Sequence, residues 1–289
     1  MSFVLAADTS GDIPRKEMRE RNIEYIPLVF IIDGTEYPDN FSDDSEFKWF
    51  YDQVRAGKLP STSQINVATH EDFFMSLVDK YDDDILYVTL SSGLSSSCES
   101  ARLAAENVKN KTGRKIYVVD SLGATISQRH VVDEAERLRN AGATAAEAAE
   151  KLAEFVTHIQ TWFMPTDLMH LKRGGRASGA AAYIGTALKI KPIIFIDSLG
   201  KLPVIKKVHG AEKGIAFMAK MFADDSAETP HKFYIASADS EYAEQLLSAA
   251  KAVRRDCEGE IGWIGPVIGA HTGCGAVGIS FVSDIKRRY

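Results

Sequence analysis

The sequence predicts an α/β protein of two domains, with a parallel sheet in the first half and a mixed α/β arrangement in the second. Short apolar runs alternate with helical patterns through the first half, and this alternation is typical of a parallel sheet with helices on both faces. In the second half, two apolar runs joined by a Leu-Gly turn indicate an antiparallel hairpin. The chain has 289 residues, which is too long for one core of ordinary size.

The first half contains short runs of apolar and β-branched residues that predict strands. We expect these strands at residues 3–7, 25–32, 85–90 and 116–119. Apolar residues at a spacing of three or four predict helices between them. We expect these helices after Pro14 and at residues 46–56, 70–81, 96–109, 122–141 and 144–157.

The second half has a different pattern, and we place the domain boundary near residue 159. The predicted domains are therefore residues 1–158 and 159–289, packed closely because no Ser/Pro-rich linker separates them. We expect strands at residues 193–197, 203–208, 233–238 and 276–282, and helices at residues 211–223 and 241–255.

Composition excludes several classes of partner. Hydrophobic residues make up 45% and charged residues 26%, as in soluble globular proteins, and the net charge of −6 argues against nucleic acid and anionic membranes. The three cysteines lack zinc-site spacing, which favours a reduced protein of the cytoplasm. No apolar stretch reaches the ~18 to 20 residues of a membrane span, so we expect no stable membrane insertion.

Two hydroxyl-rich segments are candidates for binding an anion. Residues 60–64 read Pro-Ser-Thr-Ser-Gln, either a ligand loop or a turn bonded to its own backbone. Residues 91–97, Ser-Ser-Gly-Leu-Ser-Ser-Ser, follow a predicted strand and open a helix, where backbone amides favour an anion. Ser96 and Glu99 fit a capping box, but capping explains only one or two of these serines.

Two further segments combine glycine with polar side chains. Residues 171–176, Leu-Lys-Arg-Gly-Gly-Arg, predict a basic loop that binds an anion or an acidic partner, or a solvated turn. Six glycines fall between Gly262 and Gly278, where His271 and Thr272 are the polar side chains capable of directed hydrogen bonds. A ligand role and a structural role both remain open for His271.

In this order, the four segments resemble the motifs of the DegV family. The resemblance adds Asp-Thr-Ser at residues 8–10 and Asp-Ser at residues 120–121 to the segments above, and it covers nearly the whole chain. The chain differs from the usual family pattern at Ile65, Ser96, Cys98, His209 and Cys274. None of these differences falls on a residue that the resemblance assigns to ligand binding.

The resemblance implies a long-chain fatty acid, palmitate-like or oleate-like, buried between two domains, with no cofactor and no metal. It implies a carrier that presents the carboxylate to the catalytic subunit of a fatty acid kinase, which forms an acyl phosphate for phospholipid synthesis. The implied ligand-binding residues are Thr62, Ser63, Ser92, Ser95, His271 and Thr272. The resemblance places Arg173 and Arg176 near the entrance, where phosphate or the kinase would arrive.

Two enzymatic alternatives compete with this interpretation. Ser95 and His271 suggest an acyl hydrolase or transferase, although the sequence lacks a Gly-x-Ser-x-Gly elbow and an obvious third member. A nucleotide-dependent oxidoreductase is weaker, because Asp-Thr-Ser-Gly stands where a Gly-x-Gly-x-x-Gly loop would be needed.

Overall fold

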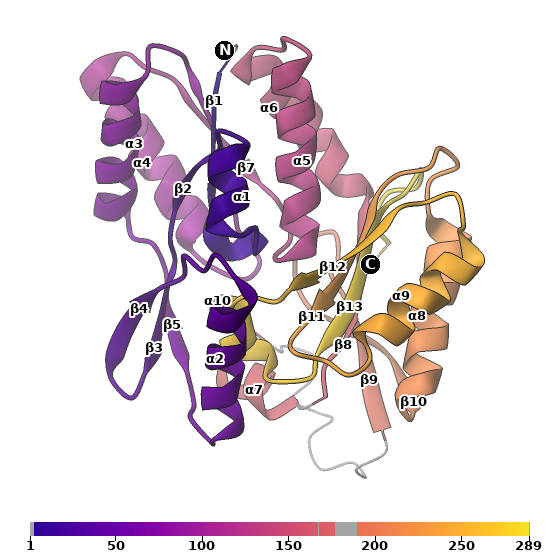
Figure 1. Ribbon diagram of the computed structural model, residues 1–289. Helices are drawn as coiled ribbons and strands as arrows, with labels where there is room; N and C mark the ends of the chain where they lie inside the picture. The colour runs from indigo at the N-terminus through magenta and orange to yellow at the C-terminus, as the bar shows by residue number, and fades with distance from the viewer. Residues whose placement is uncertain (1–2, 167, 177–189, 289) are drawn as a thin grey trace.

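A four-stranded parallel sheet organises the first half of the protein (Figure 1). The structure, a computed structural model, describes residues 3–166, 168–176 and 190–288. The order of this sheet is β2-β1-β6-β7. The strands are β1 (Val4–Asp8), β2 (Glu24–Ile26), β6 (Ile85–Thr89) and β7 (Ile116–Asp120).

Helices cover both faces of this sheet, which is why every residue of β1 and β6 is buried. Alternate residues of β1 enter different cores, since side chains point to opposite faces along a strand. One face carries α3 (Val67–Lys80) and α4 (Ser97–Thr112). The other carries α1 (Arg15–Glu20), α5 (Ile126–Asn140) and α6 (Ala145–Phe155).

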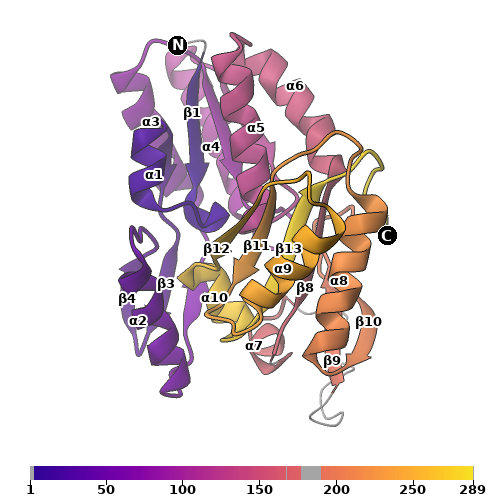
Figure 2. The same cartoon turned by 45° about the vertical axis from the view of Figure 1, so that its right-hand side comes forward.

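A six-stranded mixed sheet organises the second half, in the order β10-β9-β8-β13-β11-β12. Only the β11–β12 pair is parallel among its described pairings. The strands are β8 (Ile159–Met164), β9 (Ile190–Phe195), β10 (Val204–His209), β11 (Phe233–Ser237), β12 (Gly259–Trp263) and β13 (Val277–Val282). Helices α8 (Ala211–Asp225) and α9 (Ala243–Val253) cover one face, and α5 contacts β8, β11 and β13 (Figure 2).

A small third sheet joins the two halves. It has the order β4-β3-β5 and contains β3 (Val29–Ile32), β4 (Thr35–Pro38) and β5 (Ser61–Ser63). Helix α10 (Pro266–Thr272), from the glycine-rich segment, packs against β3, β5 and α2 (Asp44–Arg55). This approach requires glycine at residue 269, because a Cβ there would lie 2.7 Å from the Tyr51 hydroxyl.

The predicted fold class is confirmed, with a parallel sheet in the first half and a mixed sheet in the second. Residue 159 is the first residue of β8, so the two large sheets are built from opposite sides of the predicted boundary. The predicted division into residues 1–158 and 159–289 stays a proposal, since one buried core cluster contains residues from both sides.

Several predicted elements were wrong in detail. The strand predicted at residues 25–32 is two strands, β2 and β3, which belong to different sheets on either side of Pro27. Residues 121–125 are not helical, and the helix predicted from residue 122 begins at Ile126, after positive φ angles at Leu122 and Thr125. The polar loop at residues 60–64 contains a strand, β5, which pairs antiparallel with β3.

Candidate functional site

The four polar segments singled out in the sequence meet around one cavity of about 70 Å³. It lies where β5, the start of α4, α7 (Leu168–Arg173) and α10 come together. Its polar lining consists of Thr62, Ser63, Gln64, Ser95, Arg176, His271 and Thr272. The rest of the lining is apolar: Leu28, Leu90, Leu94, Leu171, Leu202, Val267 and Ile268. The cavity therefore combines hydrogen-bonding groups with a hydrophobic wall.

Thr62 and His271 form a hydrogen bond across the cavity. The distance from Thr62 Oγ1 to His271 Nε2 is 2.9 Å. Pairing of β5 with β3 places Thr62 opposite Phe30, and α10 packs against both strands. Two groups separated by 209 positions in the chain are thereby brought into contact.

His271 is a neutral imidazole with unused hydrogen-bonding capacity. Burial, and secondarily the positive charge of Arg176, lower the pKa of His271 to about 4. Its Nδ1 atom is buried and has no partner among the described residues. The turn after α7 packs against this ring, since a Cβ on Gly174 would lie 2.0 Å from Nδ1. A neutral ring offers one donor and one acceptor, so it can bind a polar group without carrying charge.

Ser95 and Ser97 connect the serine-rich segment to the chain that follows β5. Ser95 Oγ accepts a hydrogen bond from the backbone N–H of Ser97 at 3.2 Å and lies 3.0 Å from Ser97 Oγ. Ser97 Oγ in turn accepts from the N–H of Ile65 at 3.2 Å. Ser96 occupies the N-cap position, but its side chain makes no capping bond, so the predicted capping box is wrong. Ser95 satisfies the helix start instead.

The buried carboxylate of Asp8 lies behind the cavity lining and holds it in place through hydrogen bonds. No role for Asp8 in the site was predicted from the sequence. Asp8 accepts hydrogen bonds from Leu90 N at 2.8 Å, Thr89 Oγ1 at 2.7 Å and Gln128 Nε2 at 2.9 Å, and from Ser10. These bonds hold the ends of β1 and β6 together and position Leu90, which lines the cavity. The available signal was an acidic residue at the carboxyl end of the first parallel strand.

The basic segment at residues 171–176 is partly helical. Arg173 is the last residue of α7, not a loop residue as predicted, and its side chain is exposed outside the cavity lining. Arg176, which follows α7, lines the cavity and donates to the carbonyl of Leu94 at 3.2 Å, so it connects the basic segment to the serine-rich segment.

Ser92 is the one predicted ligand-binding residue that the structure keeps away from the cavity lining. Its side chain is exposed, and its backbone N–H donates to the carboxylate of Asp120 at 3.2 Å.

A second, almost entirely apolar cavity of about 60 Å³ adjoins the first. The two cavities share four lining residues: Leu94, Leu202, Ile268 and Thr272. Its other lining residues are Ala124, Thr125, Ile126, Thr161, Phe163, Ile196, Ala236, Ile264 and Gly278. It lies between the start of α5 and the six-stranded sheet, and sequence reasoning named none of these nine residues as a site.

The hydrolase alternative gains no support from this geometry. The Ser95 hydroxyl bonds with Ser97, and the imidazole of His271 bonds with Thr62. The two proposed catalytic side chains are therefore engaged with different partners. A serine nucleophile needs its base within hydrogen-bond reach.

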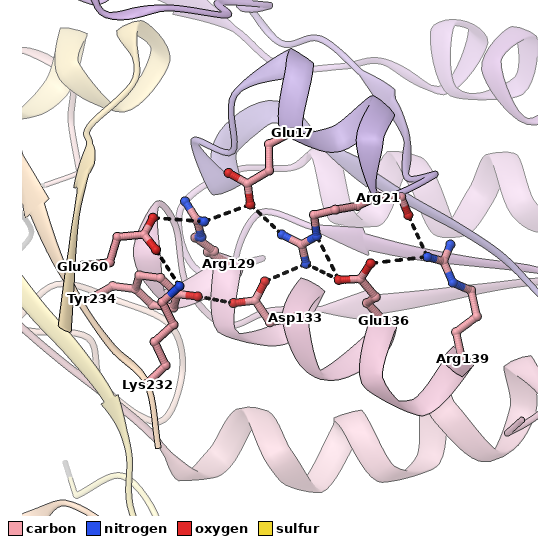
Figure 3. A network of polar contacts seen from close by, with 9 residues as sticks. All are labelled: Glu17, Arg21, Arg129, Asp133, Glu136, Arg139, Lys232, Tyr234 and Glu260. Atoms are coloured by element: carbon pink, nitrogen blue, oxygen red, sulfur yellow. Dashed lines mark hydrogen bonds and ion pairs between the residues drawn. The ribbon is translucent and has the colours of Figure 1, made fainter. Parts of the chain in front are cut away.

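An ion-pair network ties the two halves together along α5 (Figure 3). The carboxylate of Glu17 lies 2.8 Å from both Arg21 and Arg129. Arg129 also reaches Glu260 of β12 at 3.2 Å, and Asp133 accepts a hydrogen bond from the Tyr234 hydroxyl. The network thus links α1 and α5 to the six-stranded sheet.

Among the described residues, no helix is long and apolar enough to cross a membrane. Within the same residues, no three His, Cys, Asp or Glu side chains are grouped to hold a metal ion.

The chain is similar to known proteins over nearly its whole length. Residues 2–284 match the family model described as "Uncharacterised protein, DegV family". A DegV domain-containing protein of Clostridium perfringens is 32% identical over 288 residues, which make up 98% of this chain and 98% of that protein.

Two solved structures share the fold. A DegV lipid binding protein from Thermotoga maritima has a TM-score of 0.85 and 28% identity, with 100% of each chain covered. DegV from Bacillus subtilis, described as a fatty acid binding protein, has a TM-score of 0.85 and 28% identity, covering 98% of this chain and 100% of that one. With the family model matching residues 2–284, this chain belongs to the DegV family.

Proposed function

We propose that this protein is a carrier that binds one long-chain fatty acid, palmitate-like or oleate-like, without covalent chemistry. The observation that carries the proposal is the junction of a polar cavity with an apolar one through four shared residues. A carboxylate suits the first cavity and a hydrocarbon chain the second. Similarity to the fatty acid binding protein from Bacillus subtilis supports this assignment.

The polar cavity can satisfy a carboxylate largely with neutral groups. A buried carboxylate is unfavourable unless it is hydrogen-bonded. The hydroxyls of Thr62, Ser63 and Ser95 line the cavity, beside His271 and Thr272. Neutral donors hold the anion less tightly than a close ion pair would, which suits a ligand that must be handed on. Arg176 adds one cation at the edge of the cavity.

In this proposal, burial of the acyl chain supplies most of the binding energy. Each buried methylene contributes ~0.8 kcal/mol, so a 16-carbon chain gains on the order of 10 kcal/mol before the losses of association. Affinity should therefore depend strongly on chain length and less strongly on any one hydroxyl.

The bound acid is proposed to be the substrate of a separate kinase subunit, which transfers the γ-phosphoryl group of ATP to a carboxylate oxygen. The carrier contributes no catalytic residue and then holds the acyl phosphate for phospholipid synthesis. Arg173 is exposed and ends the helix that supplies Leu171 to the cavity lining. A guanidinium in this position can bind phosphate or an acidic face of the kinase.

Arg173→Ala tests the division between binding and presentation. We expect fatty-acid affinity to stay within a few-fold, because Arg173 touches neither cavity, while acyl-phosphate formation falls when kinase and ATP are supplied. Arg173→Lys should restore only part of the activity. A collapse of lipid binding with normal phosphorylation of the remaining complex would show that Arg173 holds the head group.

The carrier proposal is tested by extracting lipid from purified protein under denaturing conditions and identifying it by mass spectrometry. We expect about one fatty acid per chain, or stoichiometric uptake of added palmitate or oleate after delipidation. Protein that neither contains nor takes up these acids would disprove the carrier function. Release of free acid from an added acyl ester would instead favour the hydrolase.

A further inference from the structure

Arg287 is a buried arginine near the C-terminal end that lies outside both cavities. Its side chain is 7% exposed, yet it carries a guanidinium, a group that is rarely buried without a strong structural reason. Its hydrogen bonds go to main-chain carbonyls. Nε donates to Ile159 at 2.5 Å, and Nη1 donates to Leu122 at 2.6 Å and to Asp197 at 3.4 Å.

These three carbonyls belong to three segments that line the apolar cavity. Leu122 lies two residues before Ala124, and Ile159 lies two residues before Thr161. Asp197 directly follows Ile196. Each carbonyl held by Arg287 is thus one or two residues from a side chain that faces the cavity.

The three segments come from opposite walls. Leu122 belongs to the connection between β7 and α5, in the first half of the chain. Ile159 begins β8, and Asp197 lies in the connection between β9 and β10, in the second half. One guanidinium therefore joins the wall formed by the start of α5 to the wall formed by the six-stranded sheet.

On the basis of the proposed function, we propose that Arg287 is a positioning residue for the acyl chain. It holds the two walls of the apolar cavity close enough for both to contact the chain. Dispersion contacts weaken steeply when two apolar surfaces separate by even a fraction of an ångström. A loosened cavity would contact each methylene less well, while the hydroxyls around the carboxylate stay in place. Arg287 therefore governs how much affinity each added methylene contributes.

The test is a chain-length series. Delipidated protein is titrated calorimetrically with decanoate, laurate, myristate and palmitate, for the wild type and for Arg287→Met. A fully buried methylene multiplies affinity about fourfold. We expect a factor near this value for the wild type and about two- to threefold per methylene for Arg287→Met.

The neighbouring residue gives a matched control. Arg288 is exposed and pairs with Asp225 at 3.3 Å, away from the cavity, so Arg288→Met should keep the wild-type factor. A purely structural role for Arg287 would lower the melting temperature and leave the factor per methylene unchanged.

The outcomes separate this inference from the proposed function. If the wild type binds none of the four acids, the carrier function itself fails. If the wild type binds the acids and Arg287→Met shows the same gain in affinity per methylene, the positioning role of Arg287 is wrong, while the carrier function still stands. If Arg287→Met does not fold, Arg287→Lys is titrated in its place. An ammonium cannot reproduce the fork that reaches three carbonyls, so the gain in affinity per methylene should again fall below the wild-type value, and an unchanged gain would overturn the positioning role.

Discussion

At the scale of residues, the site depends on hydroxyls and one uncharged histidine. The low pKa of His271, about 4, follows first from burial and then from Arg176, and both causes are visible only in the folded chain. The residue types were predictable from the sequence, as were their segments. The contact between Thr62 and His271 was not, because no local pattern relates positions so far apart.

Thr62→Ala should weaken fatty-acid binding without unfolding the protein. The change removes a hydroxyl that lines the polar cavity, and a hydrogen bond to a charged group contributes about 1.5 to 3 kcal/mol, or roughly ten- to hundredfold in affinity. Titration with a fluorescent fatty acid measures the change. Ser61→Ala is the matched control, since Ser61 is exposed on the same strand and lines neither cavity. Equal affinities for the two variants would mean that the carboxylate lies elsewhere.

Asp39 is 4% exposed and lies beside the start of α10. Burial, aided by the negative charge of Asp8, raises the pKa of Asp39 to about 8, and a bond from the amide of Val267 opposes the shift. An unfolded aspartate ionises near pH 3.9. Between these values the folded protein keeps a proton that the unfolded chain loses, so rising pH removes stability.

Asp39→Asn cannot ionise and should escape this loss. Between pH 5 and pH 8 its free energy of unfolding should rise relative to the wild type by more than about 1.4 kcal/mol, the equivalent of one pKa unit. Urea unfolding of both proteins at the two pH values provides the measurement. Titrating groups such as His130 and His271 are present in both proteins and largely cancel. Asp12 does not cancel, because burial and the charge of Asp39 raise its pKa, and the substitution reduces this shift and so adds to the expected difference. Parallel pH dependence in the two proteins would show that Asp39 is ionised in the fold.

At the scale of elements, the long helices and buried strands were predictable and the short elements were not. Helix α3 follows from apolar residues at helical spacing, and β6 from a continuous apolar run. Strand β5 has the sequence Ser-Thr-Ser, which has no apolar alternation, and it exists because β3 offers a free edge. Helix α10 contains glycine, a poor helix former, because its neighbours leave no room for a Cβ.

Gly174→Ala tests the close packing of the turn after α7 on His271 of α10. The new Cβ would lie 2.0 Å from Nδ1 of His271, so either the ring or this turn must move and the bond to Thr62 is disturbed. We expect a loss of about 1 to 3 kcal/mol in stability and a several-fold loss of fatty-acid affinity. Thermal unfolding and the fluorescent titration measure the two effects.

Gly262→Ala serves as the control for this change. A Cβ at residue 262 would meet its nearest neighbour, Ile126, at 3.9 Å, which is ordinary contact. If both alanine variants bind fatty acid as the wild type does, the turn after α7 does not constrain His271.

At the scale of the whole molecule, α5 is the central element. It contacts β1 and β6 of the parallel sheet and β8, β11 and β13 of the mixed sheet, and it carries Arg129 and Asp133 of the network in Figure 3. The parallel sheet with helices on both faces was predictable from the alternation of strands and helices. The apolar cavity was not, because its lining comes from short stretches scattered between Leu94 and Gly278, each of which reads as ordinary core.

We propose that one fatty acid lies with its carboxylate in the polar cavity and its chain in the apolar one. Anomalous diffraction from crystals of the protein with 16-bromopalmitate tests it most directly, because the bromine marks the end of the chain. We predict a bromine peak within contact of residues that line the apolar cavity, and a carboxylate within hydrogen-bond distance of Thr62 Oγ1 or Ser95 Oγ. A bromine peak outside this cavity, or a carboxylate remote from both hydroxyls, would show that the fatty acid does not bind in this way.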